Sequence, residues 1–527
     1  MDTKRVIIAI ALSVAVVLAW NYVALKMGWV EQVPHNIAQE TTQSERLDSS
    51  LASTTDPVRF FAQGESVVIE TPLYKATLAV NGGILTSLSL EKYSTSATKE
   101  EPFQFIAPQA LSFAPLGVLL NTTPTWGGGT WKASHSSLNL QEGEEKTLTL
   151  SADINGVQMT REFLFSADSY IIQERTVVHT QETQQMQIGY SLSAGELSTD
   201  AKYNGTKVAW DINNSIKTEN DIGDLKKGQE ATGNIQWIGI MDNYFLAAIA
   251  PMQTSSLTMR TKYEGNVFRV ALYTPSALSS SSTPAVASTY YYIGPKSPQM
   301  LEKAPNELDS SITYGFFAFL SRPLILFLEF IYSFVHNYGI AIIILTCLIK
   351  LIFWPLSQKS YASMNKMKQL QPLVQELRDK YKDNKEEMNK AIMNLYKTYK
   401  VNPMGGCLPL LIQIPVFFAL YEALLNSLSL RHAMFIEYLP FTNIIWLADL
   451  STKDPLYITP IAMGISMFLQ QLLTPQTGDP IQRKIMLIMP LVFTVFFFNF
   501  PSGLVLYWLS SNVISIIQQW ILVRRKS

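Results

Sequence analysis

Cysteine and charge are both scarce in this chain of 527 residues. Only two cysteines occur, Cys347 and Cys407, and both lie inside apolar runs. The polar region 31–315 has no cysteine, which excludes disulfides as a source of its stability. Charged residues make up 16% of the chain, against roughly 25% in ordinary soluble proteins, and 47% of residues are hydrophobic. The apolar runs gather in 1–30 and 316–527, which indicates a membrane protein with one large polar region.

Motifs for catalysis are also missing. The region 57–312 has two histidines, His135 and His179, but no metal-ligand spacing and no nucleophile elbow. The nucleotide-binding pattern GxxxxGK[ST] does not occur in the chain. We therefore expect no enzymatic activity, no catalytic residue, no metal site and no cofactor.

Apolar runs predict six membrane spans. The first, 1–24, follows Lys4 and Arg5 and ends in aromatic residues rather than a cleavage site, which predicts an uncleaved anchor. The other expected spans are 340–356, 404–430, 457–473, 485–500 and 501–523. Several are shorter than the ~20 residues that cross a full bilayer, which indicates local thinning of the membrane or little tilt of the helices.

Basic residues predict the orientation of these spans. They gather in the loop 357–403, in the loop 474–484 and in the tail 524–527, whereas the loop 431–456 has few. The positive-inside bias then places both termini in the cytoplasm and the region 25–339 outside. Within that region, 313–339 is apolar but interrupted by Glu329, so we expect an amphipathic helix on the outer membrane interface rather than a seventh span.

The exported region divides into a tether and a β-rich domain. Residues 25–56 have few large apolar residues and predict a flexible linker. In 57–312, apolar residues alternate on both sides of Asn155-Gly156, a dipeptide typical of tight hairpin turns. A large β-sandwich is the expected fold of this domain.

The segment 357–403 predicts a helical hairpin. Two helical stripes flank Asp383-Asn384, which indicates two antiparallel helices. Their net positive charge suits anionic lipid or ribosomal RNA, so the ribosome is a candidate partner of this segment and of the basic tail, whereas DNA is not expected. A solvated spacer is the alternative. Two methionines at its base offer a pliable apolar surface, and two lysines lie beside them in the sequence: Met364, Met367, Lys366 and Lys368.

Lys350 is the main anomaly, because a charge inside a span is costly. Its side chain could reach the cytoplasmic edge by snorkelling, or it could face water inside the protein. Helical spacing places Thr346 beside it. Polar residues also interrupt the other spans, at Gln413, Thr494, Ser511 and Asn512. Because lipid offers such groups no partners, we infer a hydrated groove that opens to the cytoplasm, with Lys350 as its fixed charge. Glu422 lies toward the outer end of its span and is expected to be a satisfied interfacial carboxylate.

Three stretches resemble the YidC-type membrane protein insertases of the YidC/Oxa/Alb group: KVNPMGGCLPLLIQIPVFFALYEAL, DPIQRKIMLIMPLVFTVFFF and FPSGLVLYWLSSNVISIIQQ. The resemblance implies the fold of the Gram-negative bacterial form. This is a multi-domain membrane protein with an α-helical five-span insertase core plus one N-terminal span, a large periplasmic β-supersandwich domain and a cytoplasmic helical hairpin.

The resemblance also implies a function in the bacterial inner membrane. Such proteins receive hydrophobic segments of nascent membrane proteins and release them into the lipid, alone or with the Sec translocon. It assigns the groove charge to Lys350 and groove polarity to Thr346 and Gln413. It assigns contact with the substrate to apolar and aromatic positions: Ile414, Phe417, Phe496, Phe497, Tyr507 and Trp508. Lys350 stands where the family commonly has arginine, and Trp508 where a second tyrosine is frequent.

Two other functions are open on the residues alone. An anion channel or transporter would use Lys350 as a selectivity charge and would need a pore to the outside. A carbohydrate-active membrane enzyme would depend on the β-rich domain. The identity of the substrates, the oligomeric state and the surface that contacts Sec have no signal in the sequence.

Overall fold

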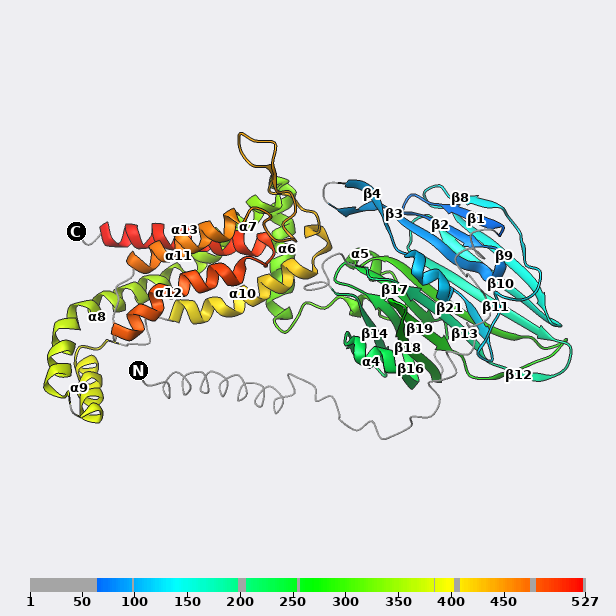
Figure 1. Cartoon of the computed structure of the whole chain (residues 1–527), viewed down its shortest axis with the longest axis horizontal. Coiled ribbons are helices and arrows are strands. Elements are labelled where there is room, and N and C mark those ends of the chain that lie inside the picture. The colour runs from blue at the N-terminus through cyan, green and yellow to red at the C-terminus, as the bar shows by residue number, and fades with distance from the viewer. Residues whose placement is uncertain are drawn as a thin grey trace. The chain divides into compact units, whose positions relative to one another are not determined.

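The computed structural model of the full chain describes residues 64–96, 99–197, 205–253, 256–382, 384–401, 408–473 and 480–524. The predicted anchor 1–24, the linker 25–56, the residues 474–479 of the loop 474–484 and the residues 525–527 of the tail lie outside this set. Within it, a β-rich part is followed in the chain by a helical part (Figure 1).

Two sheets make up most of the β-rich part. The smaller has five strands in the order β4-β3-β2-β1-β8, with β1 and β8 parallel. Its strands are β1 (Ser66–Glu70), β2 (Tyr74–Ala79), β3 (Ile84–Ser96), β4 (Lys99–Gln104) and β8 (Ser137–Asn139). The larger has fourteen strands and follows the order β6-β5-β13-β19-β18-β16-β17-β21-β11-β10-β9-β7; off this path, β14 pairs with β16, and β15 pairs with β14.

The strands of the larger sheet are β5 (Val118–Leu120), β6 (Thr123–Pro124), β7 (Lys132–Ala133), β9 (Glu145–Ile154), β10 (Val157–Ser166), β11 (Ile171–Thr180), β13 (Ile188–Ala194), β14 (Lys207–Ile212), β15 (Ser215–Glu219), β16 (Gln229–Met241), β17 (Phe245–Pro251), β18 (Ser256–Glu264), β19 (Val267–Tyr273) and β21 (Ala285–Pro295). A short pair, β12 (Gln184–Met186) and β20 (Ala277–Ser279), and two short helices, α4 (Ile222–Lys227) and α5 (Pro298–Leu301), complete this part.

The β9–β10 hairpin shows why these residues form strands. Asn155 and Gly156 have φ angles of 56° and 83°, which the tight turn requires and which these two residue types tolerate. Along β10, Met159, Phe163 and Phe165 are buried and alternate with half-buried residues. The predicted hairpin and its inward face are confirmed, and the alternation joins the strand to one continuous core.

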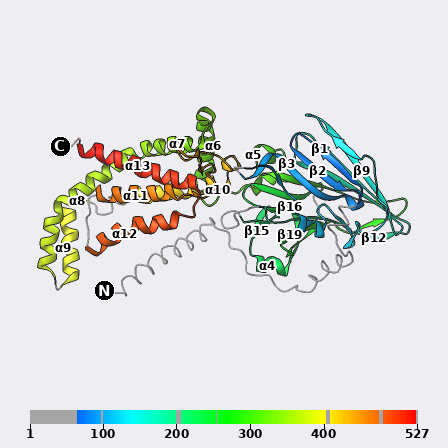
Figure 2. The ribbon, with the colours of Figure 1, turned by 45° about the horizontal axis from the view of Figure 1, so that its top comes forward.

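The helical part contains a bundle of side-by-side helices, which α6 crosses at one end and from which α8 and α9 extend at the other (Figures 1 and 2). The helices are α6 (Ala318–Val335), α7 (Tyr338–Ile352), α8 (Trp354–Lys380), α9 (Lys385–Thr398), α10 (Leu408–Asn426), α11 (Ile458–Leu473), α12 (Pro480–Phe497) and α13 (Ser502–Arg524). Their shared core includes Leu345, Leu420, Met463 and Tyr507, which come from four different helices.

The helix with Lys350 ends earlier than the expected span 340–356. A bend of 62° separates α7 from α8 at Phe353. Pro355 lies in the first turn of α8, where its missing N–H is tolerated, whereas in a continuous helix its ring would clash with the preceding turn. Lys350 therefore lies in the last turn of α7, where the helix dipole favours a cation.

By length and composition, two of the described helices could cross a membrane: α6 and residues Ser502–Ile521 of α13. A third is possible if the bent pair of α7 and α8 counts as one span. The other apolar helices are shorter, at Ile412–Asn426, Ile458–Leu473 and Met486–Phe497. Helix α6 lies within the expected range 313–339, and Glu329 is one of its residues. Its assignment to the interface stays a prediction, as does the number of spans.

The segment 357–403 contains the two expected helices, α8 and α9, and Asn384 caps α9 by accepting a hydrogen bond from Glu387 N at 3.2 Å. One expectation was wrong. Met364 and Met367 are 8% and 5% exposed and pack with Leu370 and Val401, so they form a small core rather than an open surface. Lys366 and Lys368, which flank Met367, are exposed.

Candidate functional site: a polar ring around Lys350

Three helices meet at the ammonium group of Lys350. Its Nζ donates a hydrogen bond to Ser515 Oγ of α13 at 2.8 Å and to Gln413 Oε1 of α10 at 3.3 Å. Both partners belong to helices of the bundle, so the ammonium group points toward α10 and α13. Among the described residues, no carboxylate lies within 4.0 Å of this ammonium group. The positive charge is therefore hydrogen-bonded but not neutralised.

The side chain of Gln413 closes the arrangement into a ring. Its Nε2 donates to Ser511 Oγ at 2.7 Å, while its Oε1 accepts from Lys350. Ser511 and Ser515 are four residues apart and so lie on the same face of α13. The Ser515 hydroxyl in turn donates to the carbonyl of Ser511 at 2.9 Å. We call Lys350, Gln413, Ser511 and Ser515 the polar ring. Lys350 and Gln413 are partly buried, whereas Ser511 and Ser515 are buried.

An aromatic cluster lies one helical turn from the polar ring. Phe417 follows Gln413 by four residues on α10, and Trp508 precedes Ser511 by three on α13. Their ring centroids are 4.8 Å apart in an edge-to-face arrangement. From α12, Phe493 and Phe497 join at 5.9 and 5.3 Å from Trp508. We call these four residues the aromatic cluster; it joins α10, α12 and α13 directly beside the ring.

Comparison with known proteins places this bundle and the β-rich part in one family. Residues 330–527 match the model of the 60Kd inner membrane protein family, and residues 66–327 match that of the YidC periplasmic domain. The chain is 46% identical over 534 residues to a membrane protein insertase YidC of Nitratidesulfovibrio vulgaris, which covers all of both chains. The chain belongs to the YidC family of membrane protein insertases. A YidC relative from Lawsonia intracellularis is 44% identical with full coverage of both chains, and one from Geobacter metallireducens is 37% identical over 98% of this chain and 97% of its own.

A solved YidC insertase structure with its first transmembrane domain is 18% identical and aligns with a TM-score of 0.37, covering 90% of this chain and 98% of that one. Membership of the YidC family confirms the resemblance drawn from the three quoted stretches. It also decides against an anion channel or transporter, the alternative left open on the residues alone. The YidC family is not a known family of enzymes.

Three polar residues expected in the groove of this YidC-family chain have hydrogen-bond partners outside the polar ring. Thr346 is fully buried, and its hydroxyl donates to Ile342 O at 2.6 Å within its own helix. Thr494 likewise donates to Pro490 O at 2.7 Å. Asn512 donates to Ser466 Oγ of α11 at 3.1 Å, away from Lys350. Their polarity is satisfied by the backbone or by a helix contact, which is how polar groups also hold membrane helices together.

The residues expected to contact substrate divide into two groups. Ile414 and Phe496 are 42% and 59% exposed, as such contact requires. Phe417 and Trp508 are half-buried in the aromatic cluster. Phe497 and Tyr507 are 2% and 1% exposed, so they are core residues of the bundle and the expectation of direct contact was wrong for them. Glu422 behaves as expected, since its carboxylate accepts from Asn426 Nδ2 at 3.1 Å.

Ser515 was missed by the sequence analysis, although it lies four residues after Ser511. The spacing was available, but a serine in a helix satisfies its own backbone so often that its type alone is no signal. Gln518 continues this face of α13 and is 2% exposed. Its Nε2 has no hydrogen-bond partner among the described residues, which extends the buried polarity one turn beyond the ring.

Substituting Gly464 tests the seam between α11 and α12. A Cβ at this position would overlap the Thr494 hydroxyl and would lie 3.1 Å from Thr494 Cβ. We expect Gly464→Ala to destabilise the bundle by about 1–3 kcal/mol, because overpacking forces side chains and backbone to shift. Thermal unfolding of the purified chain measures the loss, which Thr494→Ala should partly restore. Gly127→Ala, with no atom within 4 Å of the new Cβ, is the control; equal effects at both glycines would contradict the packing argument.

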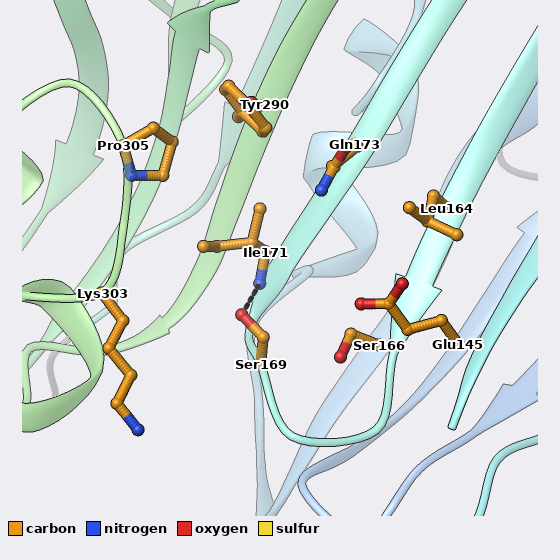
Figure 3. A pocket seen from close by; sticks show the side chains of 9 residues that line it. All are labelled: Glu145, Leu164, Ser166, Ser169, Ile171, Gln173, Tyr290, Lys303 and Pro305. Atoms are coloured by element: carbon orange, nitrogen blue, oxygen red, sulfur yellow. Dashed lines mark hydrogen bonds between the residues drawn. The ribbon is translucent and has the colours of Figure 1, made fainter. Parts of the chain in front are cut away.

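The β-rich part offers a shallow pocket of about 300 Å³. Both polar and apolar residues line it, and Figure 3 shows the Lys303 side chain apart from the Glu145 carboxylate. The dashed line there is the hydrogen bond from Ile171 N to Ser169 Oγ, 3.1 Å, which belongs to a turn. Across the described residues, no group of three or more histidine, cysteine, aspartate or glutamate side chains could hold a metal ion. The polar ring is therefore the better candidate site.

Proposed function

We propose that this protein inserts hydrophobic segments of nascent membrane proteins into the bacterial inner membrane through the polar ring. The observation that carries this proposal is the ammonium group of Lys350, which is held by Ser515 and Gln413 and has no carboxylate partner among the described residues. A positive charge without a counter-ion attracts acidic residues of a passing chain. It also keeps water at a depth where polar segments would otherwise meet lipid.

The aromatic cluster separates the polar ring from the outer part of the bundle. Phe417 and Trp508 lie one turn from Gln413 and Ser511, on the side of the helices that is predicted to face outward. Packed rings exclude water, so the aromatic cluster closes the groove toward the outside, and the charge bias of the loops assigns its open end to the cytoplasm. A polar leading segment of the substrate enters as far as the ring, and the apolar segment leaves sideways into lipid.

Burial of the apolar segment in lipid supplies the driving free energy. A fully buried leucine or phenylalanine side chain contributes about 1.5–3 kcal/mol. Exposed apolar residues such as Ile414 on α10 and Phe496 on α12 give the segment a path along the bundle. No nucleotide hydrolysis is required of this chain, because transfer into lipid is itself favourable.

The arrangement in the membrane follows from the charge bias. Both termini and the α8–α9 hairpin lie in the cytoplasm, and the β-rich domain lies in the periplasm. Helix α6 rests on the outer interface, because it crosses the bundle and presents exposed phenylalanines at positions 319, 327, 330 and 334 (Figures 1 and 2). The basic hairpin and tail contact lipid headgroups and the ribosome, and the Sec translocon is a further partner.

Site-specific crosslinking of a stalled nascent chain tests this function. A photo-crosslinker at Ile414 or Phe496 is expected to capture the hydrophobic segment of a ribosome-bound substrate. Both positions are exposed; Ile414 follows Gln413 of the ring, and Phe496 packs against Phe497 of the aromatic cluster. Leu472 of α11 is the matched control, since it is 56% exposed but lies on a different wall of the bundle. We expect several-fold more adduct at the first two positions.

Equal adduct at Leu472 and at Ile414 would mean that substrate meets the protein only through bulk lipid, which contradicts the proposal. The same experiment at Phe497, which is 2% exposed, reports whether the bundle opens during insertion. An adduct there would indicate that substrate passes between α10 and α12 rather than over their surface.

A further inference from the structure

The loop between α10 and α11 carries a small β-hairpin with an unusual tip. Strands β22 (Ile436–Tyr438) and β23 (Ile445–Leu447) pair, with Tyr438 opposite Ile445. A tight turn closes them, in which Thr442 N donates to Leu439 O at 3.0 Å. We call residues 436–447 the outer hairpin. Figure 1 shows this loop leaving the end of the bundle at which α6 lies and extending sideways, in the direction of the α6 axis.

The base of the outer hairpin is fixed to the bundle. Phe435 N donates to Leu447 O at 2.9 Å, and Asn337 Nδ2, between α6 and α7, donates to Phe435 O at 2.9 Å. The Phe435 ring lies against Gly339 so closely that a Cβ there would overlap it. The hairpin is therefore held beside the C-terminal end of α6, and the position of its tip follows from that of the bundle.

The tip exposes apolar side chains. Phe441 is 107% exposed, and Tyr438, Ile444 and Ile445 are 43–50% exposed. Phe441 also has a φ of +67°, at the turn position after Pro440, where glycine or asparagine is favoured. In water, a phenylalanine here exposes an apolar ring and holds an unfavourable backbone angle, and no contact offsets either cost. An apolar surrounding removes the cost of exposing the ring and offsets that of the backbone angle.

We infer that the outer hairpin inserts its tip into the outer interface of the lipid bilayer, with Phe441 as the anchor. The neighbouring element, α6, also exposes phenylalanines, including Phe330 and Phe334. Apolar side chains that lie at the level of the headgroups and upper acyl chains bind a membrane surface in this way. With α6, the hairpin would hold the outer end of the bundle at a fixed depth. The inference rests on the proposed topology, which places the loop 431–456 outside.

Depth-dependent quenching tests the insertion. A single cysteine at 441, in the full chain with Cys347 and Cys407 replaced by serine, carries a fluorophore in phosphatidylethanolamine–phosphatidylglycerol vesicles. Lipids with a quencher high on the acyl chain are expected to quench this probe at least about threefold more than they quench a probe at position 278. Leu278 is 62% exposed and lies on β20. Ile465 on α11, which is 56% exposed, is the lipid-facing reference. A probe at 441 that behaves like the one at 278 overturns the inference.

A second variant separates the anchor from the fold. Phe441→Asn suits the positive φ and removes the ring, so thermal stability should not fall, whereas lipid quenching of a probe at Ile444 should drop at least about twofold. Unchanged quenching would show that Phe441 is no anchor. Pyrene excimers at 441 without lipid quenching would assign the tip to a second copy of the chain and would also overturn the inference. Labelling of Thr452→Cys by an impermeant thiol reagent tests the topology separately, because Thr452 is an exposed residue of the same loop.

Discussion

Replacing Lys350 with glutamate is expected to abolish membrane insertion, and replacing it with arginine to preserve it. Two unit charges 4 Å apart interact by about 4 kcal/mol at an effective dielectric constant of 20, so reversing the charge turns a comparable attraction for acidic residues into repulsion. Water in the proposed groove would weaken this effect. A fall of at least about tenfold in insertion rate, which corresponds to 1.4 kcal/mol, is a conservative expectation.

Arginine should be tolerated because its donors can reach the acceptors that Lys350 uses, Gln413 Oε1 and Ser515 Oγ. Leucine is the more informative change, since it removes the charge and leaves both acceptors without a donor. We expect an intermediate loss for leucine. The assay depletes the native protein and follows insertion of a substrate with a short acidic leading segment. Lys453→Glu is the control, because Lys453 is an exposed lysine of the loop 431–456.

Full insertion with leucine at position 350 would contradict a role for the charge. Another outcome is that leucine at position 350 impairs a substrate without acidic residues as much as the acidic one. That result would indicate that Lys350 acts by keeping the ring hydrated. The amount of each variant in the membrane must be measured in parallel, so that a folding defect is distinguished from a defect in insertion.

The sequence predicted part of the polar ring because membrane physics restricts the choices. A lysine in a span needs water or polar partners, and Gln413 and Ser511 were candidates from their depth in other spans. Thr346, Thr494 and Asn512 met the same criterion but bond outside the ring, since a short polar side chain can satisfy its own helix or a neighbouring one. The presence of polar groups inside apolar helices is plain from the sequence, whereas the partner that each one bonds is not.

A similar division holds for the β-rich part. The β9–β10 hairpin was predictable because its turn and its alternation are local. The pairings of β13 with β19 and of β17 with β21 join strands far apart in the sequence, and no local pattern specifies them. In the helical part, Phe497 and Tyr507 were placed by family resemblance alone, which gives a position in the chain but not its burial.

Arg161 and Glu174 were also missed, because alternation predicts inward positions but not that a charge will occupy them. Both side chains are fully buried. Arg161 makes a two-pronged contact with Glu174, at 2.7 Å from Nε and 2.8 Å from Nη2. Its remaining donors reach the carbonyls of Gly82 and Leu116. The guanidinium thus joins β10 and β11 of the larger sheet to the turn between β2 and β3 of the smaller one.

Removing Arg161 alone should therefore be among the most destabilising changes in the β-rich part. Arg161→Ala leaves the Glu174 carboxylate buried without its partner, at an expected cost of 3–5 kcal/mol, typical of broken buried ion pairs. Arg161→Met with Glu174→Leu removes both charges and keeps most of the volume, so it should recover most of the stability. Pulse proteolysis of the full chain in urea measures each free energy of unfolding.

The same two strands supply the control on their other face. Arg175 and Glu162 form an ion pair at 3.1 Å, but their side chains are 53% and 38% exposed. Arg175→Ala should change stability by no more than about 1 kcal/mol, because water screens an exposed pair. Equal losses at Arg161 and Arg175 would contradict the importance of burial. If the double replacement of Arg161 and Glu174 were as unstable as Arg161→Ala, the lost links to Gly82 and Leu116, rather than the stranded carboxylate, would be the main cost.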